Sequence, residues 1–189
     1  DFRKHFSAIV RRDVRQLVEV FEKLAALVTE GELNFTTVDV HTVVDDVVTG
    51  IELADEGLGK PLQLEVTPDP SPQMVKVDVA QLRRALSYLV WYLTHHSPPN
   101  QARVSVTIGR HGEKDRGESV RIVIGSRTAA APADKLHRLF DPVLMVQESL
   151  IDVGPAVSQR LIEAVGGQLS LRQARNELGF TVLLPPAAP

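Results

Sequence analysis

Two stretches with the apolar–polar alternation of β-strands, residues 102–109 and 119–125, flank the charged segment RHGEKDRGE in the middle of the chain. Alternation with a period of two predicts strands that bury one face, and the polar connection joins them as an antiparallel hairpin. A second pair, residues 168–173 and 180–185, flanks ARNELG in the same way. The chain is therefore expected to contain a largely antiparallel sheet, on which its helices must pack.

Helical segments are predicted before and between these hairpins. The stretch at residues 2–29 contains no Gly or Pro, and Gly31 follows it as a stop signal. Asp78 is well placed to cap a helix at residues 79–96. The other predicted elements are helices at residues 41–57, 131–140 and 153–167 and short strands at residues 61–66 and 74–77. This order predicts an α/β (α+β) two-layer sandwich, a mixed sheet covered on one face by helices, with a separate long helix in front.

Three parts of the chain follow from this pattern. Residues 1–32 form the first helix, residues 33–185 form the sandwich, and residues 186–189, at the PPAAP end, form a flexible tail. Apolar residues of the first helix recur at the alternating spacings of four and three that mark the a and d positions of a coiled coil. Such a seam needs a partner helix, so we predict a dimer interface at Val10, Val14, Leu17, Phe21, Leu24 and Val28.

Composition excludes several classes of protein. The chain has no cysteine, which rules out disulfides, iron–sulfur clusters and thiolate zinc sites. A net charge of −3 gives no indication of nucleic-acid binding, and 43% hydrophobic residues suffice for a globular core. No apolar run approaches the roughly 18 residues that span a bilayer, and no secretory signal opens the chain. We therefore expect a cytoplasmic protein, and since Asp1 is not a natural start, we expect further residues upstream.

Four stretches occur in an order that carries a resemblance: LVEVFEKLAALVTEGELNFTTVDVHTVVDDVV, LQLEVTPDPSPQMVKVDVAQLRRALSYLV, DKLHRLFDPV and GPAVSQRLIEAVGGQLSL. In that order they are similar to the domain junction, the N-box region, the F box and the second glycine box of a sensor histidine kinase. The resemblance covers nearly the whole chain. It implies the last helix of a dimerisation domain followed by an ATP-binding domain of the gyrase, Hsp90 and histidine kinase superfamily.

The N-box helix of the working family supplies an Asn that helps to hold Mg²⁺ and the nucleotide phosphates. Counted from Asp78, the two usual Asn positions of that helix fall on Tyr88 and Tyr92. A neutral phenol is a poor ligand for Mg²⁺, which prefers harder oxygen donors. The resemblance therefore implies that both rings occupy space that the family keeps for phosphate.

The two glycine boxes of the family also differ here. The first is an Asp-x-Gly-x-Gly run, and counting along VRIVIGSRTAAAP places Gly125 at the Asp position that anchors adenine, with Arg127 and Ala129 at the glycines. The second normally cradles phosphate with backbone amides at the start of a helix. In LIDVGPAVS only Gly154 is retained, and Asp152 adds a negative charge. The lid before this loop contains the apolar run VLMV at residues 143–146, expected to cover the vacated pocket or to contact another protein.

These departures from the family pattern imply a degenerate kinase, a pseudokinase of bacterial two-component signalling with no catalytic residue, cofactor or metal. The expected partners are a response-regulator receiver domain, a kinase or other signalling domain, or a second copy of the chain. The vestigial nucleotide pocket is predicted at Tyr88, Tyr92, Gly125, Arg127, Asp152 and Gly154.

Two alternatives stay open. One is a divergent ATP-binding histidine kinase or ATPase with a rebuilt pocket, in which Arg127 or His95 meets phosphate and Tyr92 stacks on adenine. The other is an ATP-independent histidine phosphotransfer protein, whose acceptor His lies upstream of the present sequence.

Overall fold

The computed structural model of the chain describes residues 32–56, 62–113, 117–131, 136–141, 153–174 and 177–187. The first helix and its seam lie outside these residues, as do the VLMV run and Asp152. The described elements follow the order β1 (Phe35–Asp39), α2 (Val40–Glu56), β2 (Gln63–Thr67), β3 (Met74–Asp78), α3 (Val79–His95), β4 (Arg103–Glu113), β5 (Gly117–Ser126), α6 (Gly154–Ala164), β6 (Gln168–Ala174) and β7 (Glu177–Leu184).

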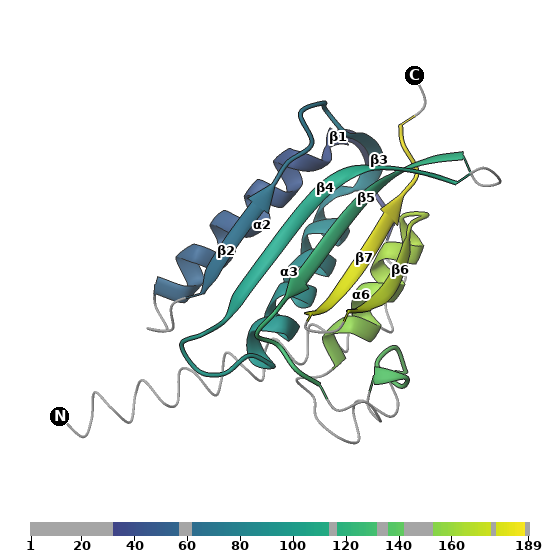
Figure 1. Ribbon diagram of the computed structural model, residues 1–189. Coiled ribbons are helices and arrows are strands. Elements are labelled where there is room, and N and C mark those ends of the chain that lie inside the picture. Colours follow the sequence, from purple (N-terminus) through teal and green to yellow (C-terminus); the bar gives the residue numbers. More distant parts are fainter. Residues whose placement is uncertain are drawn as a thin grey trace.

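Five of the described strands form one mixed sheet in the order β2-β4-β5-β7-β6. Strand β2 runs parallel to β4, whereas the other neighbours are antiparallel. Figure 1 shows α2, α3 and α6 together on one face of this sheet. The predicted two-layer sandwich, with a mixed sheet covered on one face by helices, is confirmed.

The hydrophobic core lies between the sheet and these helices. Side chains that alternate along the strands, such as Ile122 and Ile124 of β5, are buried beneath α3. Helix α3 begins where predicted, because the Asp78 side chain accepts a hydrogen bond from the backbone nitrogen of Gln81. Within the described residues, no helix is both long enough and apolar enough to cross a lipid bilayer.

A second, smaller sheet has two strands, of which only β3 was predicted. Strand β3 pairs with β1, an antiparallel strand that was not predicted from the sequence. The backbone nitrogen of Ala187 donates to the carbonyl of Met74, and Pro186 bridges Val75. These contacts attach residues 186 and 187 to β3, so the hydrogen-bonded part of the chain continues past the boundary predicted at residue 185.

Helix α6 ends at a glycine for a conformational reason. Gly166 has a φ of 81°, a left-handed conformation that residues with a side chain rarely adopt. The nitrogens of Gly166 and Gly167 donate to the carbonyls of Glu163 and Ile162, which closes the helix end in a Schellman motif. Of the short helix predicted at residues 131–140, the structure describes a helical Leu136 followed by turns.

Candidate functional site

The aromatic face of α3 lies within the hydrophobic core. Tyr92 is 3% exposed, and its ring packs edge-on against Phe180 of β7 with the ring centroids 5.7 Å apart. The His96 ring centroid lies 4.3 Å from that of Tyr92, with the two rings tilted by 39°, and the His96 carbonyl accepts a hydrogen bond from the backbone nitrogen of Ala130. Tyr92 therefore serves as a packing residue that joins α3 to the sheet.

Tyr88 lies one turn earlier on α3 and contacts the start of α6. A Cβ placed on Gly154 would lie 3.3 Å from the Tyr88 carbonyl oxygen and 3.6 Å from the Tyr88 Cβ. The fully buried Ser158 hydroxyl lies 3.0 Å from the carbonyl oxygen of Ala85 in α3 and 2.8 Å from that of Gly154. The first turn of α6 is thus packed directly on α3, at the place where the family resemblance puts the phosphates.

The N-terminus of α6 has little capacity to bind an anion in this arrangement. Residues 153–158 are all buried, whereas a phosphate-binding helix start must present its backbone N–H groups to the ligand. Pro155 lies in the first turn and has no N–H to offer. This helix start contributes packing to the domain core.

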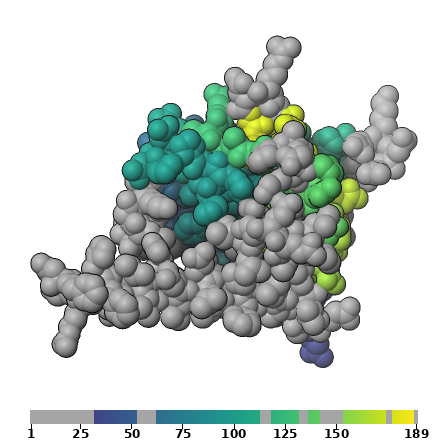
Figure 2. Space-filling model, turned by 90° about the horizontal axis from the view of Figure 1, so that it is seen from below, coloured from purple at the N-terminus to yellow at the C-terminus, as the bar shows by residue number. Residues whose placement is uncertain are grey.

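The end of β5 is tied to the end of α3 by hydroxyl groups. The Thr128 hydroxyl oxygen lies 3.0 Å from both the Ser97 and the Ser126 hydroxyl oxygens. It also accepts a hydrogen bond from the backbone nitrogen of Arg103, and the Ser126 hydroxyl accepts from the nitrogen of Ala129. In Figure 2 the teal residues near position 100 lie beside the green residues that follow β5. The loop that follows β5 is therefore held by side chains of the protein itself.

Gly125, which the resemblance aligns with the adenine-binding Asp, faces away from the helices. Ile122, Ile124 and Ser126 alternate toward the helices and are buried there, so Gly125 faces the opposite side of the sheet. A Cβ on Gly125 would overlap the carboxylate of Glu177 on that side. The next residue, Ser126, is the one that faces the helices at this end of β5.

The Thr128 hydroxyl lies at the centre of this network. Its removal should therefore lower the stability of the domain. Replacing Thr128 with Val keeps the shape of the side chain but removes the oxygen that pairs with Ser97 and Ser126. We expect the free energy of unfolding to fall by about 1 kcal/mol, since Ser97 and Ser126 each lose one hydrogen bond of a partly buried network but keep others. Urea denaturation of the variant measures the change. Thr107→Val, at an exposed position of β4, is the matched control, and equal effects of the two substitutions would contradict the role of Thr128.

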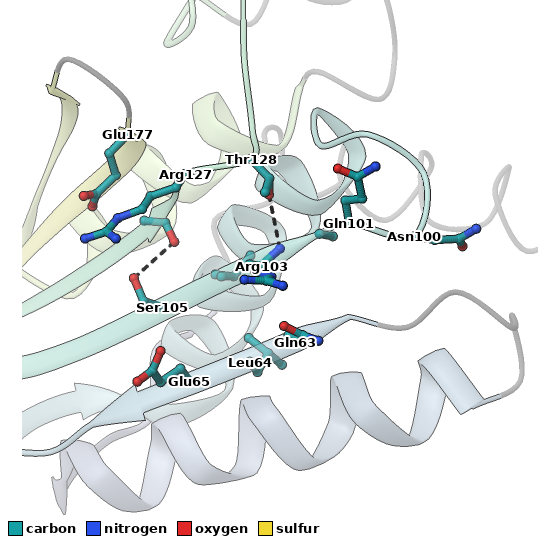
Figure 3. Close-up of a pocket in the computed structure, with 13 residues that line it drawn as sticks. Gln63, Leu64, Glu65, Asn100, Gln101, Arg103, Ser105, Arg127, Thr128 and Glu177 are labelled. Atoms are coloured by element: carbon teal, nitrogen blue, oxygen red, sulfur yellow. Dashed lines mark hydrogen bonds between the residues drawn. The ribbon is translucent and has the colours of Figure 1, made fainter.

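A cavity of about 730 Å³ opens on the uncovered face of the sheet. Figure 3 shows its polar lining, which includes Glu65, Arg103, Ser105, Arg127 and Glu177. Among the described residues, its lining comes from β2, β4, β5, β7 and the adjoining loops and includes none from α3 or α6. This cavity therefore lies apart from the contact between α3 and α6, but it shares Thr128 with the hydroxyl network at the end of β5.

The six residues predicted to line a vestigial pocket do not lie together in the structure. Tyr88, Tyr92 and Gly154 lie together where α3 meets α6 and β7. Gly125 and Arg127 line the cavity on the uncovered face, and Asp152 lies outside the described residues. Ser97, Ser126 and Thr128 were missed, because nothing in the sequence marks hydroxyl groups 29 and 31 positions apart as neighbours.

The carboxylates with shifted pKa values lie elsewhere in the domain. Burial raises the pKa of Asp39, but hydrogen bonds from His41 and from the backbone nitrogen of Gln73 outweigh it, and the net pKa is lowered. Hydrogen bonds from Ser71 lower the pKa of the exposed Asp69. Among the residues that the structure describes, no group of three His, Cys, Asp or Glu side chains is placed to hold a metal ion.

Two curated sensor histidine kinases are similar to the chain in sequence. No protein-family model matches the chain. In sequence, it is 22% identical to the sensor histidine kinase ZraS of Klebsiella oxytoca over 179 residues, which are 94% of this chain and 37% of that protein. Against ZraS of Salmonella typhimurium the identity is 22% over 182 residues, 95% of this chain and 37% of that protein. The chain therefore spans well under half the length of these curated relatives.

Solved structures show the same fold. Full-length ShkA in complex with AMPPNP is similar to the chain with a TM-score of 0.77 at 16% identity, over 100% of this chain and 40% of that chain. The histidine kinase AdeS of Acinetobacter baumannii has a TM-score of 0.68 at 16% identity, over 97% of this chain and 84% of that chain. Taken with the order of the elements and the mixed sheet, these likenesses show that the described residues have the fold of a histidine kinase ATPase domain.

Proposed function

We propose that this ATPase-like domain is a non-catalytic pseudokinase module of cytoplasmic two-component signalling, which acts through protein contacts and without ATP. The observation that carries the proposal is the burial of Tyr92, whose ring contacts both Phe180 and His96. In working relatives the corresponding position supplies an Asn to Mg²⁺ and phosphate. A tyrosine ring that forms part of the core has no freedom to reach a ligand.

The surrounding contacts support the same conclusion. A triphosphate would need room between α3 and the first turn of α6, and there Gly154 packs against Tyr88. An adenine amino group would need an acceptor at the helix-facing end of β5, and there the Ser126 hydroxyl is already bonded to Ala129 and Thr128. Leaving one such amino group unpaired costs about 1–3 kcal/mol, or about one to two factors of ten in affinity.

The proposed partners are proteins of the same signalling system. Sensor histidine kinases act with response regulators and as dimers, and we propose a receiver domain, a kinase or a second copy of this chain as the partner. The contact between copies would use the seam of the first helix, from Val10 to Val28 in the sequence. This part of the proposal rests on the spacing of the seam, which lies outside the described residues.

Phosphate transfer is the activity that the proposal excludes. Incubation of the chain with Mg·ATP labelled at the γ-phosphate is expected to leave the protein unlabelled and the nucleotide intact. Slow hydrolysis that Arg127→Ala abolishes would contradict the proposal and would favour the divergent ATPase with a rebuilt pocket. Arg84→Ala, at an exposed position of α3, controls for the loss of one surface charge.

A further inference from the structure

The small sheet has an open edge, and that edge belongs to β1. Strand β3 pairs with β1 on one side, and residues 186 and 187 contact it on the other. Within the described part of the chain, no strand pairs with the outer edge of β1. The strand has the sequence FTTVD, without the lysine or proline that commonly keeps an exposed edge from pairing with another chain. Strand β1 can therefore accept a further strand.

Hydrogen bonds at both ends of β1 show which of its residues face this edge. The backbone nitrogens of Asn34 and Val40 both donate to acceptors at the two ends of β3. Because the direction of the backbone groups alternates along a strand, those of Thr36 also point toward β3. The N–H and C=O groups of Phe35 and Thr37 therefore point to the open edge.

The side chains of Phe35 and Thr37 suit a second strand of the same sequence. Phe35 is 41% exposed, so much of its apolar ring has no cover. Thr37 lies two residues further along β1, on the same face. Aromatic and β-branched side chains stabilise neighbouring strands when they lie opposite each other. An antiparallel copy of β1 would place its Thr37 opposite Phe35 and its Phe35 opposite Thr37.

The sequence before β1 gives two copies a reason to meet here. Residues 1–31 lie outside the described residues and contain the predicted seam, which ends at Val28. Val28 and Thr36 are 8 positions apart, a length that spans up to about 26 Å when fully extended. Because packed helices lie about 8–10 Å apart, a contact along the seam would bring the two β1 strands within reach of each other.

We propose that β1 pairs with β1 of a second copy of the chain, antiparallel across a two-fold axis at Thr36. Phe35 of each copy exchanges backbone hydrogen bonds with Thr37 of the other, and the two Thr36 residues face each other as a pair without hydrogen bonds. An axis at Thr37 would instead set Phe35 opposite Asp39, whose carboxylate already accepts hydrogen bonds at the start of α2. The inference rests on the part of the proposed function that makes a second copy the partner, and it adds a contact outside the seam.

Disulfide cross-linking tests this pairing directly, because the chain has no cysteine of its own. Residues that face each other without hydrogen bonds have Cα atoms about 4.5 Å apart, within the range of about 4.4–6.8 Å that a disulfide needs. Thr36→Cys in the full chain should therefore form covalent dimers on mild oxidation, read on a non-reducing gel. Thr37→Cys, whose counterpart lies diagonally at about 7–8 Å, and Thr107→Cys, at an exposed position of β4, should cross-link about tenfold more slowly.

Leu24→Cys, in the seam, separates the two contacts between copies. Cross-linking at Leu24 but not at Thr36 overturns the β1 pairing and leaves the seam of the proposed function standing. Faster cross-linking at Thr36 than at Thr37 and Thr107 supports the β1 pairing, whether or not Leu24 cross-links. Equal rates at Thr36 and Thr37 indicate chance collisions and overturn it.

Phe35→Ser measures what the exposed ring contributes to the contact. In sedimentation equilibrium we expect the dimer Kd to rise about fivefold, since each copy loses an aromatic cross-strand contact. Met74→Ser is the matched control, because Met74 is exposed to the same extent, 41%, but lies on β3 and not at the open edge. It should leave the Kd unchanged. An equal effect of the two substitutions overturns the proposal.

Discussion

Replacing Tyr92 with Asn, the residue of the working family, is expected to lower the free energy of unfolding by about 4 kcal/mol and to leave the domain unable to bind ATP. The ring is 3% exposed and contacts both Phe180 and His96, and removal of a buried aromatic side chain leaves a cavity that the surroundings fill only in part. The Asn amide would in addition be buried among apolar neighbours. Urea denaturation followed by circular dichroism measures the loss.

The matched control is Tyr92→Phe. It keeps the edge-on contact with Phe180 and the stack with His96, so it should retain most of the stability. The difference between the two variants isolates the contribution of the ring. A Tyr92→Asn protein that is as stable as the wild type would contradict the assignment of Tyr92 to the core. The same variant with a newly acquired affinity for ATP would show that the nucleotide site is intact apart from this residue.

The second large effect is expected at Gly179 of β7, where a side chain would overlap the backbone of β5. A Cβ at this position would lie 2.5 Å from the Ile124 carbonyl oxygen and 2.9 Å from the Gly125 Cα. Both contacts are with backbone, which cannot rotate away as a side chain can, so the strands must separate. We expect Gly179→Ala to lower the free energy of unfolding by about 3 kcal/mol, again measured by urea denaturation.

Gly50→Ala provides a control of opposite sign. Gly50 lies on the exposed side of α2, and nothing comes within 4 Å of a Cβ placed there. Because alanine is the better helix former, this substitution should raise the stability by up to about 1 kcal/mol. If Gly179→Ala and Gly50→Ala shift the denaturation midpoint in the same direction, the close approach of β5 and β7 is not what requires glycine at position 179.

Much of the fold could be predicted because it depends on local periodicity. The alternation in β4 and β5 defined a hairpin, and the Asp78 cap defined the start of α3. The pairing of the two short strands could not be predicted, since β2 joins β4 in the large sheet while β3 pairs with β1. Those partners are set by contacts between distant segments, which a single sequence does not record.

The candidate site could likewise be predicted only in part. The resemblance brought Tyr88, Tyr92 and Gly154 into one region, and the structure places them there. Adjacent residues of a strand point to opposite faces, so Gly125 faces away from the helices and Ser126 faces them. The buried pair Ile122 and Ile124 was the available signal, and continuing its alternation leads to Ser126.

The central claim is that the region of α3, α6 and the end of β5 holds no nucleotide, and calorimetric titration of the full chain with ATP in the presence of Mg²⁺ tests it most directly. We predict no saturable heat of binding, because Tyr92 is buried in the core and Gly154 packs against Tyr88. A saturable heat with micromolar affinity, lost on Thr128→Val but retained on Arg127→Gln, would place ATP at the end of β5 and contradict the claim.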